Sequence, residues 1–360
     1  MDVYDKLRVN LDAHPSGAPQ STHFTEILEV LFTPEEAALA LHLNFSPKPL
    51  DRIADSAMMS ADDAERLLES MADKAVIFSI SKGGQKSYGL MATVPGLFEF
   101  PFLTRGGWPG FQKLGKLWED YHRESFGESF AGRPTPGARV VPVERSLDSS
   151  LRVHPYEEVA KLINEVDFIA LANCACRISV GACDMPLDVC LIFDSPGRFL
   201  ARRKYAKEIS REEAHAVLDK AEKAGLVHTS NNSADRPMFI CNCCKCCCTI
   251  LRGLTQLKLP TAFAVSAFQA GINSAECTNC GTCSEGRCPV GAIEIRDEVA
   301  CVAADKCIGC GLCVSVCPVN AVSLVRRNVE PEIPGTAREM AVKILQEKGK
   351  LEKFLKLAQS

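Results

Sequence analysis

The sequence lacks any run of about eighteen consecutive apolar residues, the length that a membrane-spanning helix needs. Its opening stretch, MDVYDKLRVN, has neither the apolar core of a secretory signal nor the arginine content of a transit peptide, which favours a cytoplasmic protein. It also lacks a GxGxxG fingerprint after a strand and a GxxxxGK[ST] phosphate loop. We therefore expect no membrane span and no binding site for a nucleotide that would supply a hydride.

An excess of charge of either sign is also missing. The chain has 41 lysines and arginines against 45 aspartates and glutamates, a formal net charge of −4, so its overall charge does not indicate nucleic acid or an anionic membrane as a partner. Hydrophobic residues make up 46% and charged residues 24%, which is typical of soluble globular proteins. A length of 360 residues indicates two or three domains.

Cysteine, by contrast, is abundant, with 19 residues. Many of these cysteines are too closely spaced to pair with one another, because neighbours such as Cys243 and Cys244 cannot easily form a relaxed disulfide. Soft thiolates in a chain without an export signal instead indicate bound metal in a reducing compartment.

The strongest pattern is a repeat between residues 274 and 327. CTNCGTCSEGRCPVGAIEI, which begins at Cys277, is followed by CIGCGLCVSVCPVNAVSL, which begins at Cys307. Each copy has three cysteines at three-residue steps, so a curled loop can reach three irons of one cluster, and then a Cys-Pro pair and an aliphatic segment. This doubled pattern closely resembles the bacterial two-cluster ferredoxin.

The resemblance implies two [4Fe–4S] clusters that carry single electrons. In that family the fourth cysteine of each run binds the other cluster. Applied to this chain, the family's pattern assigns Cys277, Cys280, Cys283 and Cys317 to cluster one, and Cys307, Cys310, Cys313 and Cys288 to cluster two.

The first run departs from the family, because four residues, SEGR, precede its last cysteine where three are usual. We expect an enlarged loop there. Cys301 falls outside the pattern, and we interpret it as an apolar packing residue.

Ten further cysteines lie in the middle of the chain: Cys174, Cys176, Cys183, Cys190, Cys241, Cys243, Cys244, Cys246, Cys247 and Cys248. Three interpretations are open, namely buried structural cysteines, a zinc site and at least one further iron–sulfur cluster. We favour the further cluster, because ten thiols exceed the need of one zinc ion and the ferredoxin-like region already implies iron–sulfur chemistry. The segments NCACR and CNCCKCCC resemble a group of large ferredoxin-like proteins of anaerobes, a resemblance that brings no activity with it.

The run CNCCKCCC would have two faces if it opened a helix continuing into TILRGL. One face would carry Cys241, Cys244 and Cys248, and the other would carry Cys243, Cys246 and Cys247. Three basic residues are candidates to offset the negative charge of a thiolate-bound cluster, with solvated surface as the alternative: Arg177, Lys245 and Arg252.

The first 94 residues predict a helical unit with a hairpin. We expect helices at residues 23–32, 34–43, 48–57 and 61–75, then strands at 76–80 and 86–91 around a Gly-Gly turn. This order resembles a winged helix. DNA is a disfavoured partner, because the helix that would read the bases carries Asp62, Asp63, Glu65, Glu69 and Asp73 against only Arg66 and Lys74. A protein-docking module is the better interpretation.

Taken together, the patterns predict an α+β multidomain protein. Its expected parts are a winged-helix-like domain at 1–94, a wrapping connector at 95–150, a mainly helical cysteine-rich middle domain at 151–273, a two-cluster ferredoxin domain at 274–327 and a C-terminal helical arm at 328–360. The favoured function is electron transfer to or from an unidentified redox partner protein, as a carrier or an oxidoreductase subunit. The alternatives are a reductase whose middle cluster is the active site and a redox-sensing winged-helix regulator.

Overall fold

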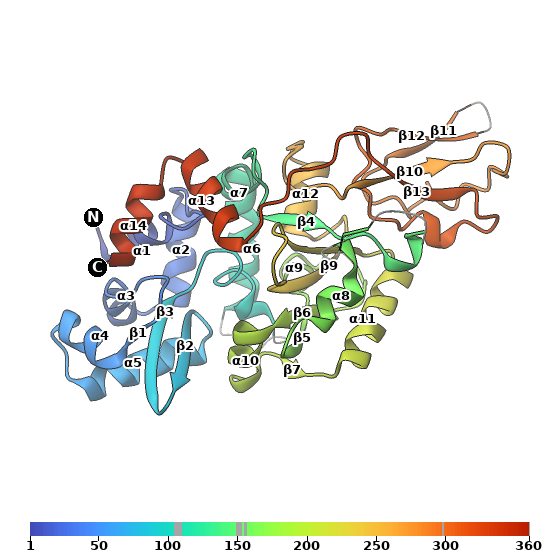
Figure 1. The fold of residues 1–360 in the computed structure, drawn as a ribbon. Coiled ribbons are helices and arrows are strands. Elements are labelled where there is room, and N and C mark those ends of the chain that lie inside the picture. Colours follow the sequence, from blue (N-terminus) through green and yellow to red (C-terminus); the bar gives the residue numbers. More distant parts are fainter. Residues whose placement is uncertain (104–109, 149–152, 155–156, 297–298, 360) are drawn as a thin grey trace.

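The described residues form both helices and strands, as expected for the α+β class. The structure is a computed structural model that describes residues 1–103, 110–148, 153–154, 157–296 and 299–359. In Figure 1 a blue N-terminal unit, a green and yellow middle unit and an orange unit follow one another along the molecule. Within the described ranges, no helix is both long and apolar enough to cross a membrane.

The N-terminal unit contains the helices and the hairpin that the sequence predicts. Its helices are α1 (Val3–Leu11), α2 (Thr22–Leu31), α3 (Pro34–Ala40), α4 (Leu50–Ala57) and α5 (Ala61–Asp73), and its strands are β1 (Lys48–Pro49), β2 (Ile77–Lys82) and β3 (Gln85–Leu90). The strands form an antiparallel sheet in the order β1-β3-β2. Thr33 and Glu36 form a capping box at α3, and the Ser60 side chain caps α5. Helix α1 and strand β1 are not among the elements that the sequence predicts.

The connector completes the core of the N-terminal unit. Its helical part is a nearly continuous rod of α6 (Phe111–Tyr121), a π-helical turn (His122–Phe126) and α7 (Gly127–Ala131). The Trp118 ring lies 5.2 Å from the Phe98 ring and 5.9 Å from the Phe24 ring, between centroids. Burial of such large rings is strongly favourable. The described part of the connector is therefore packed into the same buried core as the N-terminal helices.

The middle unit is built on a sheet, so the prediction of a mainly helical domain is wrong. Six strands pair in the antiparallel order β4-β8-β9-β6-β5-β7. They are β4 (Ala138–Val140), β5 (Ile169–Asn173), β6 (Asp188–Phe193), β7 (Lys207–Glu208), β8 (Val227–Asn231) and β9 (Phe239–Cys243). The strands are short, and several pair with partners far away in the sequence, so local periodicity reveals them poorly. The helices around the sheet are α8 (Val159–Asn164), α9 (Ala175–Val180), α10 (Asp194–Arg202), α11 (Arg211–Lys223) and α12 (Thr249–Thr255).

The C-terminal part contains two antiparallel strand pairs, followed by an arm. Strand β10 (Phe268–Ile272) pairs with β13 (Val322–Arg326), and β11 (Ile293–Arg296) pairs with β12 (Val299–Val302). Strand β10 precedes residue 274, where the sequence repeat suggests that this unit begins.

The arm crosses back over the middle unit to the N-terminal unit (Figure 1). It consists of α13 (Ala337–Glu347) and α14 (Leu351–Gln359), broken at Gly349, whose φ is +63°. The expected helical arm therefore consists of two helices. Lys350 bonds to Asp12 at 2.7 Å, and the Phe354 ring stacks on the Phe45 ring. The arm thus covers its own N-terminal unit.

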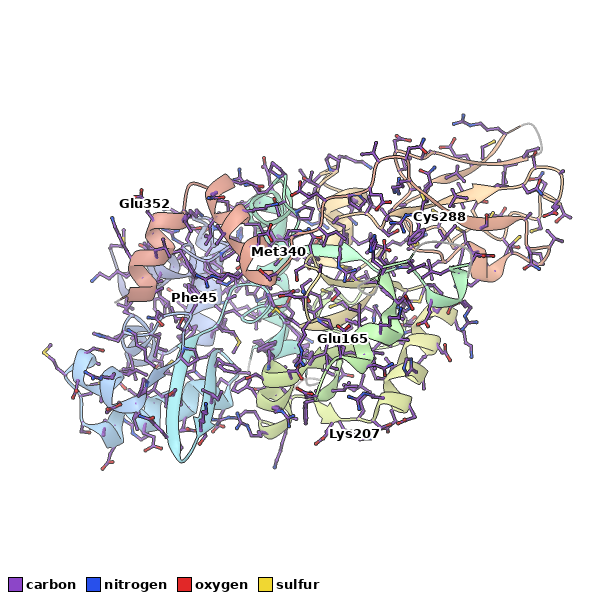
Figure 2. The ribbon with its side chains drawn as sticks, viewed as in Figure 1. Phe45, Glu165, Lys207, Cys288, Met340 and Glu352 are labelled. Carbon is purple, nitrogen blue, oxygen red and sulfur yellow. The ribbon has the colours of Figure 1, made fainter. Side chains whose placement is uncertain are left out.

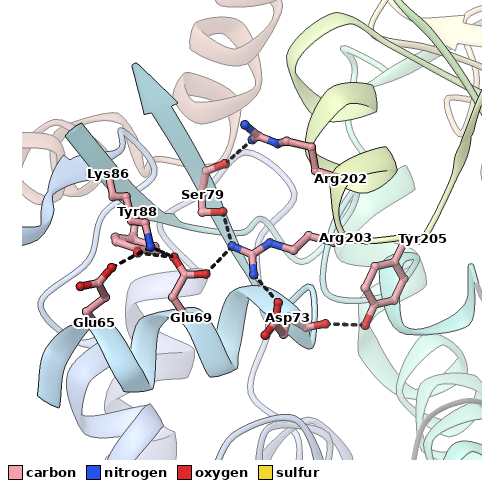
Figure 3. A network of polar contacts seen from close by, with 9 residues as sticks. All are labelled: Glu65, Glu69, Asp73, Ser79, Lys86, Tyr88, Arg202, Arg203 and Tyr205. Carbon is pink, nitrogen blue, oxygen red and sulfur yellow. Dashed lines mark hydrogen bonds and ion pairs between the residues drawn. The ribbon is translucent and has the colours of Figure 1, made fainter. Parts of the chain in front are cut away.

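Polar contacts join the N-terminal unit to the middle unit, as Figure 3 shows. The Arg203 guanidinium donates to Glu69 at 2.8 Å and to the Ser79 hydroxyl at 3.0 Å, and it also pairs with Asp73. The Tyr205 hydroxyl donates to the Asp73 carbonyl at 2.9 Å. Acidic residues of α5 therefore face the protein's own middle unit.

Candidate iron–sulfur and thiolate centres

The cysteines assigned to cluster one lie around one small cavity. Cys277, Cys280, Cys283 and Cys317 all line it, the first three from the loop after β10 and the last from the segment before β13. Gly281 takes a φ of +74°, which glycine adopts without strain and which turns the loop around the cavity. Cys280 is exposed, whereas Cys283 is buried. This centre therefore lies next to solvent.

The cysteines assigned to cluster two line a second cavity: Cys288, Cys307, Cys310 and Cys313. All but Cys288, which Figure 2 labels, are buried. The backbone N–H of Ala292 donates to the Cys288 sulfur at 3.1 Å, and that of Ala270 donates to the Cys307 sulfur at 3.5 Å. Such N–H···S bonds stabilise the more negative, reduced state of a cluster and raise its potential.

The extra residue before Cys288 does not remove that cysteine from the cavity. Arg287 fastens the loop by donating to the Leu312 carbonyl at 2.9 Å and to the Ser315 hydroxyl at 3.1 Å. Cys301 lies on β12 opposite Glu294 and lines neither cavity among the described residues. The structure thus brings together the two quartets that the ferredoxin resemblance implies.

Six of the ten middle cysteines form one connected group, called here the six-thiol group: Cys174, Cys176, Cys190, Cys241, Cys243 and Cys248. Leu191 of β6 pairs with Ile240 of β9, which places Cys190 next to Cys241 across the ladder. Cys241 and Cys243 share one side of β9 because strand side chains alternate. Of the other three, Cys174 and Cys248 are the N-caps of α9 and α12, and Cys176 lies in the first turn of α9.

Mutual effects on thiol pKa values connect these six cysteines. Contact with Cys190, together with burial, raises the pKa of Cys241. Contacts with Cys174 and Cys248 lower the pKa of Cys176 against the opposing effect of burial. Contact with Cys176 and Cys243 raises the pKa of Cys248. Cys174 and Cys248 are the N-caps of α9 and α12, and contact with Cys176 raises the pKa of both.

The remaining four middle cysteines form a separate, compact group, called here the four-thiol group: Cys183, Cys244, Cys246 and Cys247. Their sulfur atoms all lie within 4.8 Å of one another. The Cys183 sulfur is 3.8 Å from that of Cys244 and 3.7 Å from that of Cys247. Cys183 comes from the loop after α9, and the others come from the turn between β9 and α12.

The helical interpretation of CNCCKCCC is wrong. Residues 241–243 end strand β9, the next four form a turn, and α12 begins only at Thr249. Strand β9 pairs with β8 on one side and β6 on the other, and these ladders override the local tendency to form a helix. The thiols therefore sort by strand alternation and turn position, and Cys244 does not share a group with Cys241 and Cys248.

Of the basic residues considered, Arg177 lies among the thiols. It is only 2% exposed, and its Nη1 donates to the Asn242 carbonyl at 3.0 Å, while Nε and Nη2 have no partner among the described atoms. Burial lowers the pKa of Arg177, but negative charge on Cys174 and Cys244 more than reverses this. Lys245 is exposed and therefore solvated. Arg252 is buried and pairs with Glu119.

Two connector residues near the six-thiol group carry no sequence signal. His122 is buried, neither ring nitrogen has a partner among the described atoms, and burial lowers its pKa to about 4. Burial, with the charge of Cys176 adding to it, raises the pKa of Glu99 to about 8. Both lie more than fifty residues before the first middle cysteine, so only the folded arrangement reveals them.

Comparison with known proteins identifies the C-terminal unit. Residues 270–324 match the family described as 4Fe-4S dicluster domain, which implies two [4Fe–4S] clusters and electron transfer. The chain is 42% identical over 48 residues to a protein of Methanosarcina acetivorans named as a subunit of an ion-translocating oxidoreductase complex, a match that covers 13% of this chain and 18% of that protein. It is 40% identical over 40 residues to an uncharacterized ferredoxin of Methanocaldococcus jannaschii, a match that covers 11% and 26%.

The chain therefore spans about a quarter or less of the length of these curated relatives. No solved structure matches it. The comparisons give no support to the winged-helix resemblance, which stays an interpretation. What they do identify is a two-cluster, electron-transferring iron–sulfur domain at residues 270–324.

Proposed function

We propose that the protein conducts single electrons from an exposed cluster one, through a buried cluster two, to a metal centre held by the six-thiol group. The main support for this proposal is that cluster one has an exposed cysteine, whereas cysteines of the next two sites are buried. Cys280 of cluster one is exposed, whereas Cys310 and Cys313 of cluster two and Cys243 and Cys248 beyond it are buried. A partner can therefore approach cluster one closely.

Packing supports the connection between the successive sites. Cys283 of cluster one belongs to the same buried apolar cluster as Cys307 and Cys313 of cluster two. Cys310 of cluster two in turn packs in one core with Cys243 and Cys248. The Val143 N–H, from the segment after β4, also donates to the Cys310 carbonyl at 3.0 Å. Cysteines of successive sites thus share one packed core, which suits short electron-transfer steps between the sites.

The partner in this proposal is a redox protein that docks at the exposed cluster one. One relative bears the name of an oxidoreductase complex subunit, which supports a partner of that kind. We assign the N-terminal unit, interpreted as a winged helix, a protein-docking role. A DNA-binding role is disfavoured, because Arg203 engages Glu69 and Asp73 of its α5. The C-terminal arm packs on the N-terminal unit itself, where Lys350 pairs with Asp12.

Metal analysis of anaerobically purified protein tests the proposal. About twelve or more irons and as many acid-labile sulfides per chain are expected, since two [4Fe–4S] clusters account for about eight. About eight irons would confine the electron-transfer path to the ferredoxin-like unit and would contradict the proposed iron centre in the six-thiol group. Fewer than about four would overturn the electron-transfer assignment itself.

A reductase is the second candidate function, favoured by one observation. His122, buried and without a partner for either ring nitrogen among the described atoms, and Glu99 lie close enough to Cys176 to feel its charge. Groups of this kind can move protons beside a metal centre. Turnover of a small substrate with a chemical reductant and no partner protein would favour the reductase, whereas reduction of the centres without turnover would favour the carrier.

A further inference from the structure

The four-thiol group is too compact for a four-iron cluster. Its members all lie within 4.8 Å of one another, and two of their sulfur–sulfur distances are 3.7 and 3.8 Å. Four thiolates bound tetrahedrally to one zinc ion at about 2.3 Å lie about 3.8 Å apart. In a cubane each thiolate binds a different iron at a different corner, so the sulfurs must stand farther apart.

The two ferredoxin-like quartets provide an internal comparison. They line cavities of their own, yet among the described residues neither meets the 4.8 Å limit that the four-thiol group meets. The same chain therefore has two kinds of cysteine quartet, one with widely spaced sulfur atoms and one with closely spaced sulfur atoms. The closely spaced quartet fits a single metal ion.

We propose that Cys183, Cys244, Cys246 and Cys247 bind one Zn²⁺ ion at a structural site distinct from the iron–sulfur centres. Four cysteine ligands fill the tetrahedral shell and leave no open position for substrate, which is typical of structural zinc. Binding displaces the thiol protons to solvent, so Zn²⁺ with four thiolates carries a net charge of −2. No oxidation or reduction is involved.

Arg177 supplies an independent observation for this site. A buried guanidinium needs negative charge nearby, since an unpaired buried cation is very unfavourable. Arg177 is 2% exposed, its Nη1 donates to the neutral Asn242 carbonyl, and its Nε and Nη2 have no partner among the described atoms. Thiolate charge on Cys244 of the four-thiol group and on Cys174 of the six-thiol group acts on this guanidinium, so metal-bound thiolates there would provide the negative charge that it needs.

The ion would also set the geometry of the neighbouring six-thiol group. The turn that carries Cys244, Cys246 and Cys247 is bounded by Cys243, the last residue of β9, and Cys248, the N-cap of α12. The fourth ligand follows α9, the helix that carries Cys176. One ion thus ties together the three segments that present Cys176, Cys243 and Cys248.

The test measures zinc, iron and sulfide in wild type, in the double variant C183S/C246S and in C301S, a matched control outside every thiol group. We expect about one zinc per chain in wild type and C301S and a loss of at least about fivefold in the double variant, with the iron of the ferredoxin-like unit unchanged. Zinc that survives in the double variant would overturn the site, as would loss of about four irons and four sulfides in place of zinc.

Cobalt substitution of the wild-type chain keeps the proposal testable if the double variant does not fold. Co²⁺ in a tetrahedral four-thiolate site gives intense visible absorption bands, which added Zn²⁺ should abolish. No such bands would overturn the proposal. The iron count of the wild type reports separately on the proposed electron-transfer function, so the two ideas can fail independently.

Discussion

The guanidinium of Arg252 and the carboxylate of Glu119 form two parallel hydrogen bonds, Nη1 to Oε1 at 2.8 Å and Nη2 to Oε2 at 2.7 Å. Arg252 belongs to α12, whose N-cap is Cys248, and Glu119 belongs to α6 of the connector. The pair therefore fastens the thiol-bearing helix to the helix that packs on the N-terminal unit. Its bidentate geometry makes it stronger than a surface pair.

Replacing Glu119 by glutamine should destabilise this junction. Arg252 is 3% exposed, and a buried cation that loses its charged partner costs about 3 kcal/mol. We expect E119Q to lower the urea midpoint of unfolding under anaerobic conditions. E128Q, which neutralises an exposed carboxylate on α7, is the matched control and should change the midpoint little. Equal midpoints for E119Q and E128Q would show that the pair contributes nothing.

Arg203→Ala should loosen the contact between the N-terminal and middle units. The substitution removes bonds to Glu69, Asp73 and Ser79, and the expected loss is about 1–3 kcal/mol of unfolding free energy. Hydrogen exchange in α5 and α10 should rise with it. Arg66→Ala on α5 removes an exposed arginine with one 3.8 Å pair to Asp63 and should cost under about 0.5 kcal/mol. Unchanged exchange in R203A would contradict the role of this network.

Cys280→Ser should disable the entry to the electron path. We expect the variant to hold about four fewer irons than wild type, since cluster one would be lost. Reduction of the remaining centres by a protein donor should slow severalfold, while a small chemical reductant still reaches them. C301S is the control. If the protein donor reduces the variant at the wild-type rate, electrons enter elsewhere.

Arg177→Met should reduce the metal content of the middle unit while leaving the ferredoxin-like unit loaded. Methionine fills much of the same volume but removes the positive charge beside Cys174 and Cys244. We expect R177M to retain less than about half of the middle-unit metal, and R177K to retain more, because lysine restores the charge. Arg198→Met, which removes the arginine above the Phe168 ring, is the control. Full metal content in R177M would show that the charge is not needed.

Acid should weaken the protein partly through His14. Burial, with the positive charge of Lys348 adding to it, lowers the pKa of His14 from 6.5 to about 3. As pH falls below 6.5, His14 therefore binds a proton in the unfolded chain but stays neutral in the folded chain, and the free energy of unfolding declines. We expect about 1–2 kcal/mol of the decline between pH 7 and pH 5 to disappear in His14→Gln. The check is urea unfolding of both proteins at both pH values; an equal decline in both would exclude His14.

The sequence predicts the ferredoxin-like quartets because their spacing carries the information. Cys288 and Cys317 are paired with the opposite runs through a family resemblance, and the structure places each of them in the expected cavity. The hairpin of β2 and β3 is likewise local, since a Gly-Gly turn joins its strands.

The middle unit could not be predicted in this way. The grouping of Cys190 with Cys241 depends on the pairing of β6 with β9, which lie about fifty residues apart in the chain. Cys183 meets Cys244 and Cys247 through a loop with no periodic pattern. Arg177 is a candidate from its charge alone, but its burial is visible only once the sheet and α9 are folded.

The two groups of middle thiols are interleaved along a single stretch of chain. Cys243 and Cys248 belong to the six-thiol group, whereas Cys244, Cys246 and Cys247 between them belong to the four-thiol group. Deleting Lys245 would shorten the turn by one residue and misplace thiols of both groups at once. This segment should therefore accept the exchange of Lys245 for another exposed residue, but neither an insertion nor a deletion.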